Sequence, residues 1–397
     1  MIFGSFFTSF INYVYHLVMG RILEPSNYGV LAAIISLVGL LALISSSAGM
    51  VVAKMVAGAK DENEIDEQIE TYNKYGWLLG VIFFLVLLLL SPLIAQFLKV
   101  QVFLVVIGLF VFLLSFPASM VRSTLQGLMK FKNMVISQAL ENLVRLAGGV
   151  VLVIVGFSVT GGLLGLLLGV FVGWVVARQF IKNSFLKPKN SSSAITFTSM
   201  LKSLTPFLLL SISITSLYSS DLILVKHFYN SFDSGIYAAF SFLGRIIFFG
   251  VSPITAVMFP IVARNHSMGA SNGLVLKMSL LGGLIVALIV NFIYGFFPNF
   301  VIGQLYGDKY LVSSNLLIFF GIFMTLVTFS FLLLNYAMII NRYRAVWVSM
   351  CMAVLQIILI LFFHSTMFTI VIISIIVSSL LLIYLFSDLF FSRSRIS

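Results

Sequence analysis

Long apolar stretches alternate with short polar interruptions along almost the whole chain. A helix needs roughly 20 apolar residues to cross the hydrocarbon core of a bilayer, and stretches of that length recur from end to end. In the first half, the expected helices span about 1–20, 29–57, 76–98, 102–129, 133–157 and 160–181. In the second half, they span about 200–226, 235–262, 274–297, 310–340, 344–363 and 367–390. The pattern predicts an all-α polytopic membrane protein with about twelve transmembrane helices.

Composition supports this fold class and excludes a water-soluble one. Apolar residues make up 61% of the 397 residues and charged residues only 9%, and the mean hydropathy is +1.15. Soluble domains are about half apolar and a quarter charged.

The net charge of +11 is a topology signal and does not indicate nucleic-acid binding. Of the 23 cationic residues, 17 fall in every second loop and at the C-terminus. These are Lys54, Lys60, Lys74, Arg122, Lys130, Lys132, Arg178, Lys182, Lys187, Lys189, Lys202, Arg264, Lys277, Arg342, Arg344, Arg393 and Arg395. The other loops hold only Arg21, Lys99, Lys226 and Lys309. The positive-inside rule then puts both termini in the cytoplasm. The three tryptophans lie at the same helix ends, where an indole suits the headgroup interface.

A polar linker divides the chain into two similar halves. Residues 182–199 contain a proline and a serine run typical of a linker, which predicts a six-helix lobe at 1–181 and another at 200–397. A shift of 206 residues aligns GVLAAIISLVGLLALISSSAGMVVAKMVA, from Gly29, with GIYAAFSFLGRIIFFGVSPITAVMFPIVA, from Gly235, with eight of 29 positions identical. The basic triplets at 130–132 and 342–344 give a second match at nearly the same offset. The lobes are therefore expected to be pseudo-symmetric about an axis along the membrane normal.

Charges inside the predicted spans mark candidate binding residues, because a charge within a bilayer is unfavourable. The fifth helix carries Glu141 and Arg145 one turn apart, with Gln138 on the same side. The eighth helix carries Arg245 with Ser241 on the same face. Each lobe thus supplies one arginine near mid-membrane, and a guanidinium suits phosphate oxygens. This favours a pyrophosphate-binding site.

An alternative role for these charges is structural. Glu141 then neutralises Arg145, while Arg245 pairs with Asp221 to hold the seventh and eighth helices together. The two interpretations can coexist if ion pairs exchange partners with the substrate.

The first helix carries a polar stripe on one face. Its members are Ser5, Ser9, Asn12, His16 and Gly20. Asn12 and His16 are candidates for a sugar-binding or proton-sensing cavity wall, or for ordinary helix packing.

Four charges are candidates for coupling or gating. Asp221 and Glu141 are the carboxylates suited to coupling with protons or sodium, and both also suit a structural role. Asp221 and Lys226 are five residues apart, which puts them on different helix faces. Arg21 either gates the outer mouth or anchors its loop. The acidic run at 61–70 is expected to form a separate amphipathic surface helix.

Four stretches carry a family resemblance: GRILEPSNYG, LQGLMKFKNMVISQALENLVRLAGGVVLVIVGFSVTGGLLG, SSDLILVKHF and SGIYAAFSFLGRIIFFGVSPITAVMFP. Together they resemble the polysaccharide flippases of the multidrug, oligosaccharidyl-lipid and polysaccharide (MOP) exporter superfamily. The resemblance covers nearly the whole chain. It implies two six-helix lobes around a central, often cationic cavity, and transport of polyprenyl-pyrophosphate-linked sugars across the cytoplasmic membrane. The sequence departs from the family in lacking a cytoplasmic segment before the first helix, which leaves two alternatives for the start, at Met1 or upstream of it.

The expected function is therefore flipping of a lipid-linked anionic oligosaccharide by alternating access. The alternatives are a multidrug cation antiporter, which is expected to carry a carboxylate in its cavity, and a peptidoglycan lipid-precursor flippase. An enzyme is not expected, because the longest outer loops, at 229–234 and 298–309, contain one acid each and no histidine. No cofactor or metal motif is present. Expected partners are membrane lipids, a polysaccharide polymerase and glycosyltransferases.

Overall fold

Helices make up every regular element that the structure describes. The computed structural model describes residues 2–58, 62–182, 197–268 and 272–391. The helices of the first half are α1 (Ile2–Ile22), α2 (Pro25–Gly58), α3 (Glu62–Leu98), α4 (Val102–Gly127), α5 (Phe131–Leu152) and α6 (Ser158–Lys182). Those of the second half are α7 (Phe197–Phe228), α8 (Ser231–Ser267), α9 (Gly273–Phe296), α10 (Pro298–Leu305), α11 (Leu317–Ile339), α12 (Arg344–Phe362) and α13 (Met367–Phe386). Twelve of these correspond to the twelve helices predicted from the apolar pattern.

The described helices are long and apolar enough to cross a membrane several times. Ten stretches meet that condition by length and composition, and one of them, Phe131–Ile181, contains both α5 and α6. The protein is therefore a multi-pass membrane protein.

Three expected boundaries were wrong. The acidic run is not a separate helix, since α3 begins at Glu62 and continues unbroken to Leu98; no glycine or proline interrupts it before Gly76. The expected outer loop at 298–309 contains α10, which Pro298 starts because proline suits the first helical turn. Finally, α11 begins at Leu317, after two short 3₁₀ turns.

The chain divides into two compact units, residues 1–23 with 30–208 and residues 24–29 with 209–397. The first turn of α2 belongs to the second unit, and residues 200–208 at the start of α7 belong to the first. Of the expected linker at 182–199, residues 183–196 lie outside the described part of the chain.

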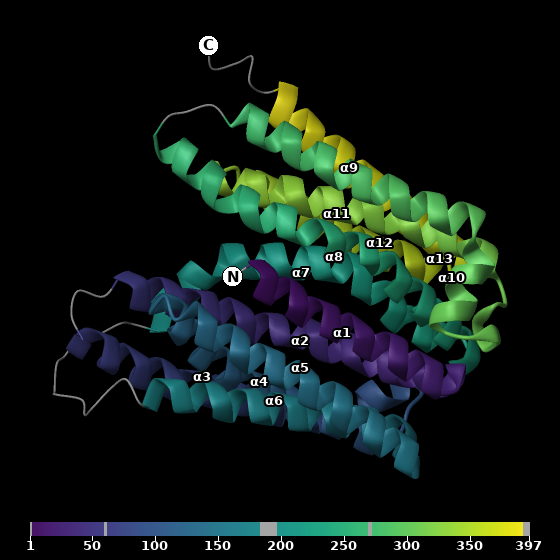
Figure 1. Cartoon of the computed structure of the whole chain (residues 1–397), viewed down its shortest axis with the longest axis horizontal. Coiled ribbons are helices and arrows are strands. Elements are labelled where there is room, and N and C mark those ends of the chain that lie inside the picture. The colour runs from purple at the N-terminus through teal and green to yellow at the C-terminus, as the bar shows by residue number, and fades with distance from the viewer. Residues whose placement is uncertain (1, 59–61, 183–196, 269–271, 392–397) are drawn as a thin grey trace. The chain divides into compact units, whose positions relative to one another are not determined.

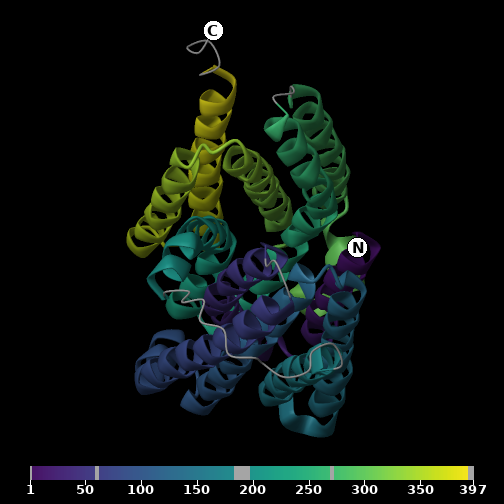
Figure 2. The same cartoon turned by 90° about the vertical axis from the view of Figure 1, so that its left-hand side faces the viewer.

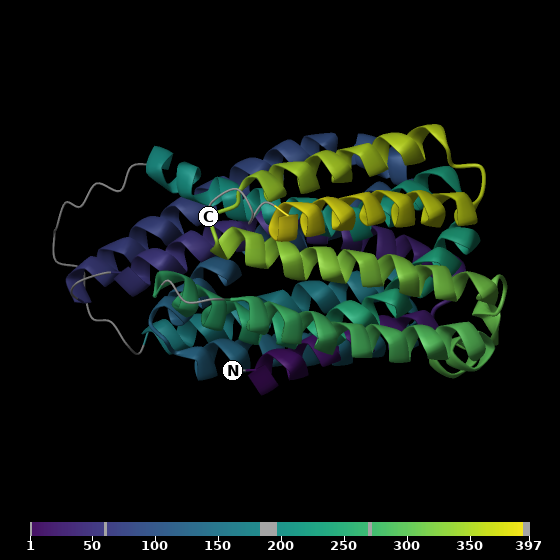
Figure 3. The same cartoon turned by 90° about the horizontal axis from the view of Figure 1, so that it is seen from above.

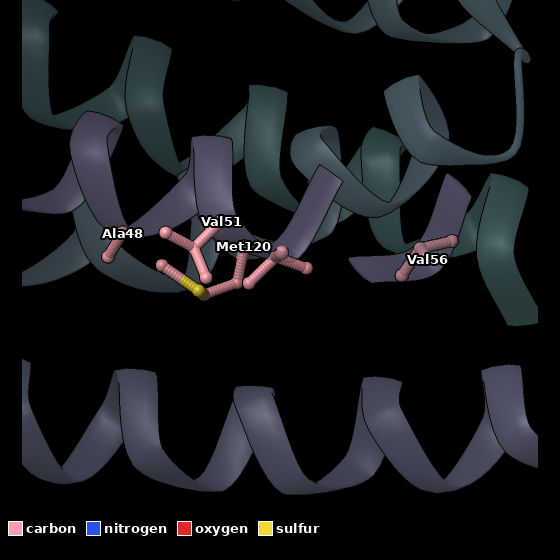
Figure 4. Close-up of a cluster of buried hydrophobic side chains, with 5 residues drawn as sticks. Ala48, Val51, Val56 and Met120 are labelled. Atoms are coloured by element: carbon pink, nitrogen blue, oxygen red, sulfur yellow. The ribbon is translucent and has the colours of Figure 1, made fainter. Parts of the chain in front are cut away.

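Within the first unit, α4 is the central helix and packs against α3 and α6. Figure 4 shows one of its contacts, an apolar cluster that Met120 forms with Ala48, Val51 and Val56 of α2. A further apolar cluster joins α4 to α5 and α6. The α5–α6 pair is a close antiparallel hairpin that reverses at Val153–Phe157, and α1 packs on α5.

The second unit repeats this order of pairing. Its central helix, α11, packs against α9 and α13, as α4 does against α3 and α6. Figure 2 shows the paired α8 and α9 in green, and Figure 3 shows α11 and α13 side by side. The residues of α11 are predominantly apolar on every face of the helix, as expected of a helix buried within a bundle.

The first turn of α2 is held in the second unit by aromatic packing. Tyr28 is fully buried there. Its ring lies 5.8 Å from that of Tyr306 and 6.4 Å from those of Tyr310 and Phe242. The hydroxyls of Tyr28 and Tyr306 are 3.3 Å apart.

Candidate functional site

A polar cavity of about 410 Å³ lies in the first unit, where α1, α4 and α5 meet. Its lining residues are Thr8, Asn12, Arg122, Gln138, Glu141, Asn142 and Arg145. Four of the seven residues expected to bind substrate are among them. Two arginines and one carboxylate give this cavity an excess of one positive charge.

Glu141 forms its ion pair with Arg122 of α4. The salt bridge of this carboxylate therefore runs to a neighbouring helix, while Glu141 also attracts the Arg145 guanidinium electrostatically. Arg122 also donates from Nε to the Ser137 hydroxyl at 3.2 Å. Both side chains of the ion pair are partly buried, so solvent screens their attraction less than at a surface.

The α6 backbone makes room for this ion pair. A Cβ on Gly173 would lie 2.8 Å from Oε2 of Glu141, and still closer to Nη2 of Arg122. Real Cβ atoms essentially never approach that closely. Gly173 therefore lets α6 pass directly behind the pair.

Arg145 lies over an aromatic ring of α1. Its guanidinium carbon is 4.3 Å from the ring centroid of Tyr15, a cation–π distance. Tyr15 is fully buried, and its hydroxyl donates to the carbonyl of Gly162 at 2.9 Å. Nε of Arg145 is buried and has no hydrogen-bond partner within the described chain. The guanidinium is thus positioned by stacking, which leaves donor capacity for an anion.

The α1 stripe is only partly at this cavity. Asn12 lines it, and its side-chain oxygen is buried without a partner among the described residues. His16 is buried, lies edge-on to Tyr15 and is not a lining residue. Arg21 is exposed. The side chains of Ser5 and Ser9 lie outside the described part of the structure.

In the second unit, Arg245 is buried between two aromatic rings. Its guanidinium carbon lies 4.3 Å from the ring centroid of Phe242 and 4.9 Å from that of Tyr218. Its Nη2 donates to the Tyr218 carbonyl at 2.7 Å, and its Nε has no partner in the described chain. Ser241, one turn before it, is also buried. Among the described residues, Arg245 and Asp221 lie beyond salt-bridge distance but still attract each other electrostatically.

Asp221 and Lys226 bond to separate partners on α8. Asp221 is fully buried and accepts from the Tyr237 hydroxyl at 2.7 Å and from the Leu222 amide at 2.8 Å. Lys226 is buried as well and donates to the Ser231 hydroxyl at 2.7 Å. The two residues therefore bond to α8 and not to each other.

Sequence reasoning missed three cavity residues, Thr8, Asn142 and Arg122. Asn142 donates from its amide to the Thr8 carbonyl at 2.9 Å and so joins α5 to α1. Arg122 was assigned to the cytoplasmic loops because it lies near the end of its helix. Its position offered one signal: Arg122 precedes the helix end at Gly127 by more than a turn, which places it within the helix and not in the loop.

The cavity has the chemistry of an anion-binding site with hydrogen-bonding groups around it. The charged groups that line it are the two guanidiniums and the carboxylate.

Solved membrane transporters share the fold. The lipid II flippase MurJ, in an inward closed conformation, matches with a TM-score of 0.78 at 14% identity, over 97% of this chain and 86% of that one. An inward-facing multidrug resistance transporter of the MATE family matches with a TM-score of 0.74 at 16% identity, over 96% and 94%. A MOP superfamily transporter from Pyrococcus furiosus matches with a TM-score of 0.64 at 16% identity, over 98% and 94%. The expected resemblance to this superfamily is confirmed for the fold.

Sequence comparison identifies the family. Curated protein sequences give no match. Residues 1–266, about two thirds of the chain, match the family of polysaccharide biosynthesis proteins. The chain therefore belongs to the polysaccharide biosynthesis protein family and has the fold of MOP superfamily transporters.

Proposed function

We propose that the protein flips a polyprenyl-pyrophosphate-linked oligosaccharide across the cytoplasmic membrane. The observation that carries this proposal is the cavity of the first unit, where Arg145 and Arg122 outnumber the one carboxylate, Glu141. A partly buried cationic site attracts anions and repels cations. Guanidiniums bind phosphate oxygens through paired hydrogen bonds.

Each cavity residue has a role in this proposal. Arg145 contacts the pyrophosphate, since stacking on Tyr15 already orients its guanidinium. Arg122 contacts the pyrophosphate by exchanging its partner Glu141 for a phosphate oxygen. This change of partner couples the ion pair to the presence of bound substrate. Asn12 and Gln138 offer amide groups to sugar hydroxyls.

The second unit contributes to headgroup binding and to coupling. We assign Arg245 and Ser241 a contact with the anionic headgroup during transport, because Nε of Arg245 and the Ser241 hydroxyl are buried without a partner in the described chain. Asp221 and Glu141 are the carboxylates assigned to ion coupling. His16, Arg21 and Lys226 are assigned supporting roles in sensing or gating.

Topology follows from the charge distribution. The basic loops are assigned to the cytoplasm, together with both termini. Access alternates between the two sides of the membrane as the six-helix lobes, 1–181 and 200–397, change orientation about the linker at 182–199. No covalent step is required, so the protein is not assigned an enzymatic activity. A polysaccharide polymerase and glycosyltransferases are the proposed partners.

Reconstitution with three substrates tests this function. Purified protein in vesicles is given a labelled polyprenyl-pyrophosphate oligosaccharide, the corresponding peptidoglycan precursor, and a lipophilic drug cation. The proposal expects flipping of the first, slower or absent flipping of the second, and no movement of the cation. Transport of the cation alone identifies a multidrug antiporter, and preference for the second lipid identifies a peptidoglycan-precursor flippase. Either result contradicts the proposal.

A further inference from the structure

A second pocket of the first unit combines apolar and cationic walls. It has a volume of about 450 Å³, lies where α3, α4 and α6 meet, and shares no lining residue with the polar cavity. Pro117, Val121 and Ile181 form its apolar part. Lys74 and Arg178 bring two positive charges to the same pocket.

Two indoles line this pocket from different helices. Trp77 of α3 and Trp174 of α6 meet edge to face, with ring centroids 6.0 Å apart and an interplanar angle of 78°. Tryptophan prefers the headgroup level of a bilayer, where its ring is apolar and its N–H is wet. The paired indoles therefore place the pocket at the membrane interface, on the side that the basic loops assign to the cytoplasm.

The two cations are available to a ligand. Both side chains are exposed, and neither forms an ion pair with another described residue. The guanidinium carbon of Arg178 lies 5.7 Å from a ring centroid of Trp174, so stacking restrains one donor group at the pocket wall. A phosphate oxygen fits such a pair of cations.

The second unit has an apolar pocket at the corresponding helices. It has a volume of about 630 Å³, lies between α9, α11 and α13, and has Lys277 as its only cation. Leucine and phenylalanine side chains, among them Leu284 and Phe329, line most of it. The helix order of each unit thus leaves a groove at this position. Of the two grooves, that of the first unit is lined by two cations and two indoles.

We propose that the pocket around Lys74, Trp77, Trp174 and Arg178 binds an anionic glycerophospholipid of the surrounding membrane. The lipid phosphate contacts Lys74 and Arg178, and the glycerol and upper acyl chains lie against Pro117, Val121 and Ile181. Charge complementarity selects this occupant, because a zwitterionic lipid brings a choline or ethanolamine cation to the same two side chains.

Quenching of tryptophan fluorescence by brominated lipids tests the assignment. The chain has three tryptophans, so a Trp347→Phe background leaves Trp77 and Trp174 as the only reporters. The purified full chain is reconstituted in nanodiscs containing brominated phosphatidylglycerol or brominated phosphatidylcholine. We expect stronger quenching by phosphatidylglycerol. The double variant Lys74→Gln/Arg178→Gln should lower the relative affinity for that lipid by about 30-fold.

Matched variants separate a specific site from general surface charge. Lys132→Gln/Arg344→Gln removes two exposed cations elsewhere and should keep the lipid preference, as should the charge-preserving Arg178→Lys. Elution as a single species from a sizing column checks the fold of each variant. Equal quenching by the two lipids overturns the proposal, as does an unchanged preference in Lys74→Gln/Arg178→Gln. Displacement of phosphatidylglycerol by millimolar inorganic phosphate also overturns it, since the site then recognises free phosphate.

Discussion

Gly29 and Gly235 lie against each other within the second unit: a Cβ on Gly29 would be 2.7 Å from the backbone nitrogen of Gly235. These two glycines occupy the same position of the internal repeat, 206 residues apart. The start of α2 therefore crosses the start of α8 at backbone contact. Any larger residue at this crossing forces the two helix starts apart.

Gly235→Ala should destabilise the protein, because the new Cβ overlaps the carbonyl of Pro25, a backbone atom that cannot move aside. Overpacking of this kind costs about 1–3 kcal/mol. The midpoint of thermal unfolding in detergent should fall. Gly39→Ala is the matched control, since a Cβ there meets no atom within 4 Å, and its midpoint should stay the same or rise. Equal midpoints for the two variants would show that the crossing tolerates a side chain.

Gly173→Ala should impair transport by displacing the Arg122–Glu141 ion pair from α6. The initial rate of flipping in vesicles is the measurement, and we expect a loss of about tenfold, equivalent to about 1.4 kcal/mol. Gly148→Ala, in α5, serves as control, because its Cβ would meet its nearest neighbour at an ordinary 3.9 Å. Wild-type flipping by a well-folded Gly173→Ala protein would remove the ion pair from the proposed mechanism.

Tyr237→Phe should lower stability through Asp221. The Tyr237 hydroxyl is the side-chain donor to this fully buried carboxyl, and loss of a donor to a buried polar group costs about 1–3 kcal/mol. The unfolding midpoint is compared with that of Ser46→Ala, which removes an exposed hydroxyl bonded only within its own helix. If Tyr237→Phe unfolds like wild type, Asp221 has another partner.

Alkaline pH should weaken the second unit through Tyr306. Burial raises the pKa of Tyr306 well above its usual range, and the neighbouring Tyr28 raises it further. Above pH about 10, the unfolded phenol loses its proton while the folded one keeps it, so stability falls as pH rises. The full contribution is present below that pH.

Tyr306→Phe should therefore lose less stability than wild type between pH 9 and 11, by at most about 1.4 kcal/mol per pH unit. Unfolding midpoints at the two pH values measure this difference. Tyr343→Phe, which removes an exposed phenol, should follow the wild type. Identical pH dependence of Tyr306→Phe and wild type would contradict a raised pKa at this position.

The length of the apolar stretches predicted the transmembrane helices, because each helix must cross the hydrocarbon core of the bilayer. The same pattern gave little information about segments outside the bilayer. The apolar pattern located twelve spans, but it predicted neither α10 nor the extension of α3 back to Glu62. Those segments lie beyond the apolar stretches, where local helix propensity decides the structure. The assignment of residues 24–29 to the second unit could not be predicted from the sequence either, because it depends on contacts such as that of Tyr28 with Tyr306, 278 positions away.

The sequence predicted which residues of one helix share the site, but not which residues of neighbouring helices they contact. Helical spacing put Gln138, Glu141 and Arg145 on one side of α5, and all three line the cavity. The ion partner of Glu141 comes from α4 and the ring beneath Arg145 from α1. Such partners depend on tertiary packing, which periodicity does not encode.

Flipping by Arg145→Gln tests the central claim most directly. Loss of a charge-assisted hydrogen bond is worth about 1.5–3 kcal/mol, so we predict that this variant flips a labelled polyprenyl-pyrophosphate oligosaccharide about ten- to 100-fold more slowly than wild type. Arg145→Gln/Arg245→Gln should be slower still, and Lys132→Gln, which removes an exposed cation of α5, should match wild type. An Arg145→Gln protein that inserts normally and flips the lipid at the wild-type rate would contradict the account.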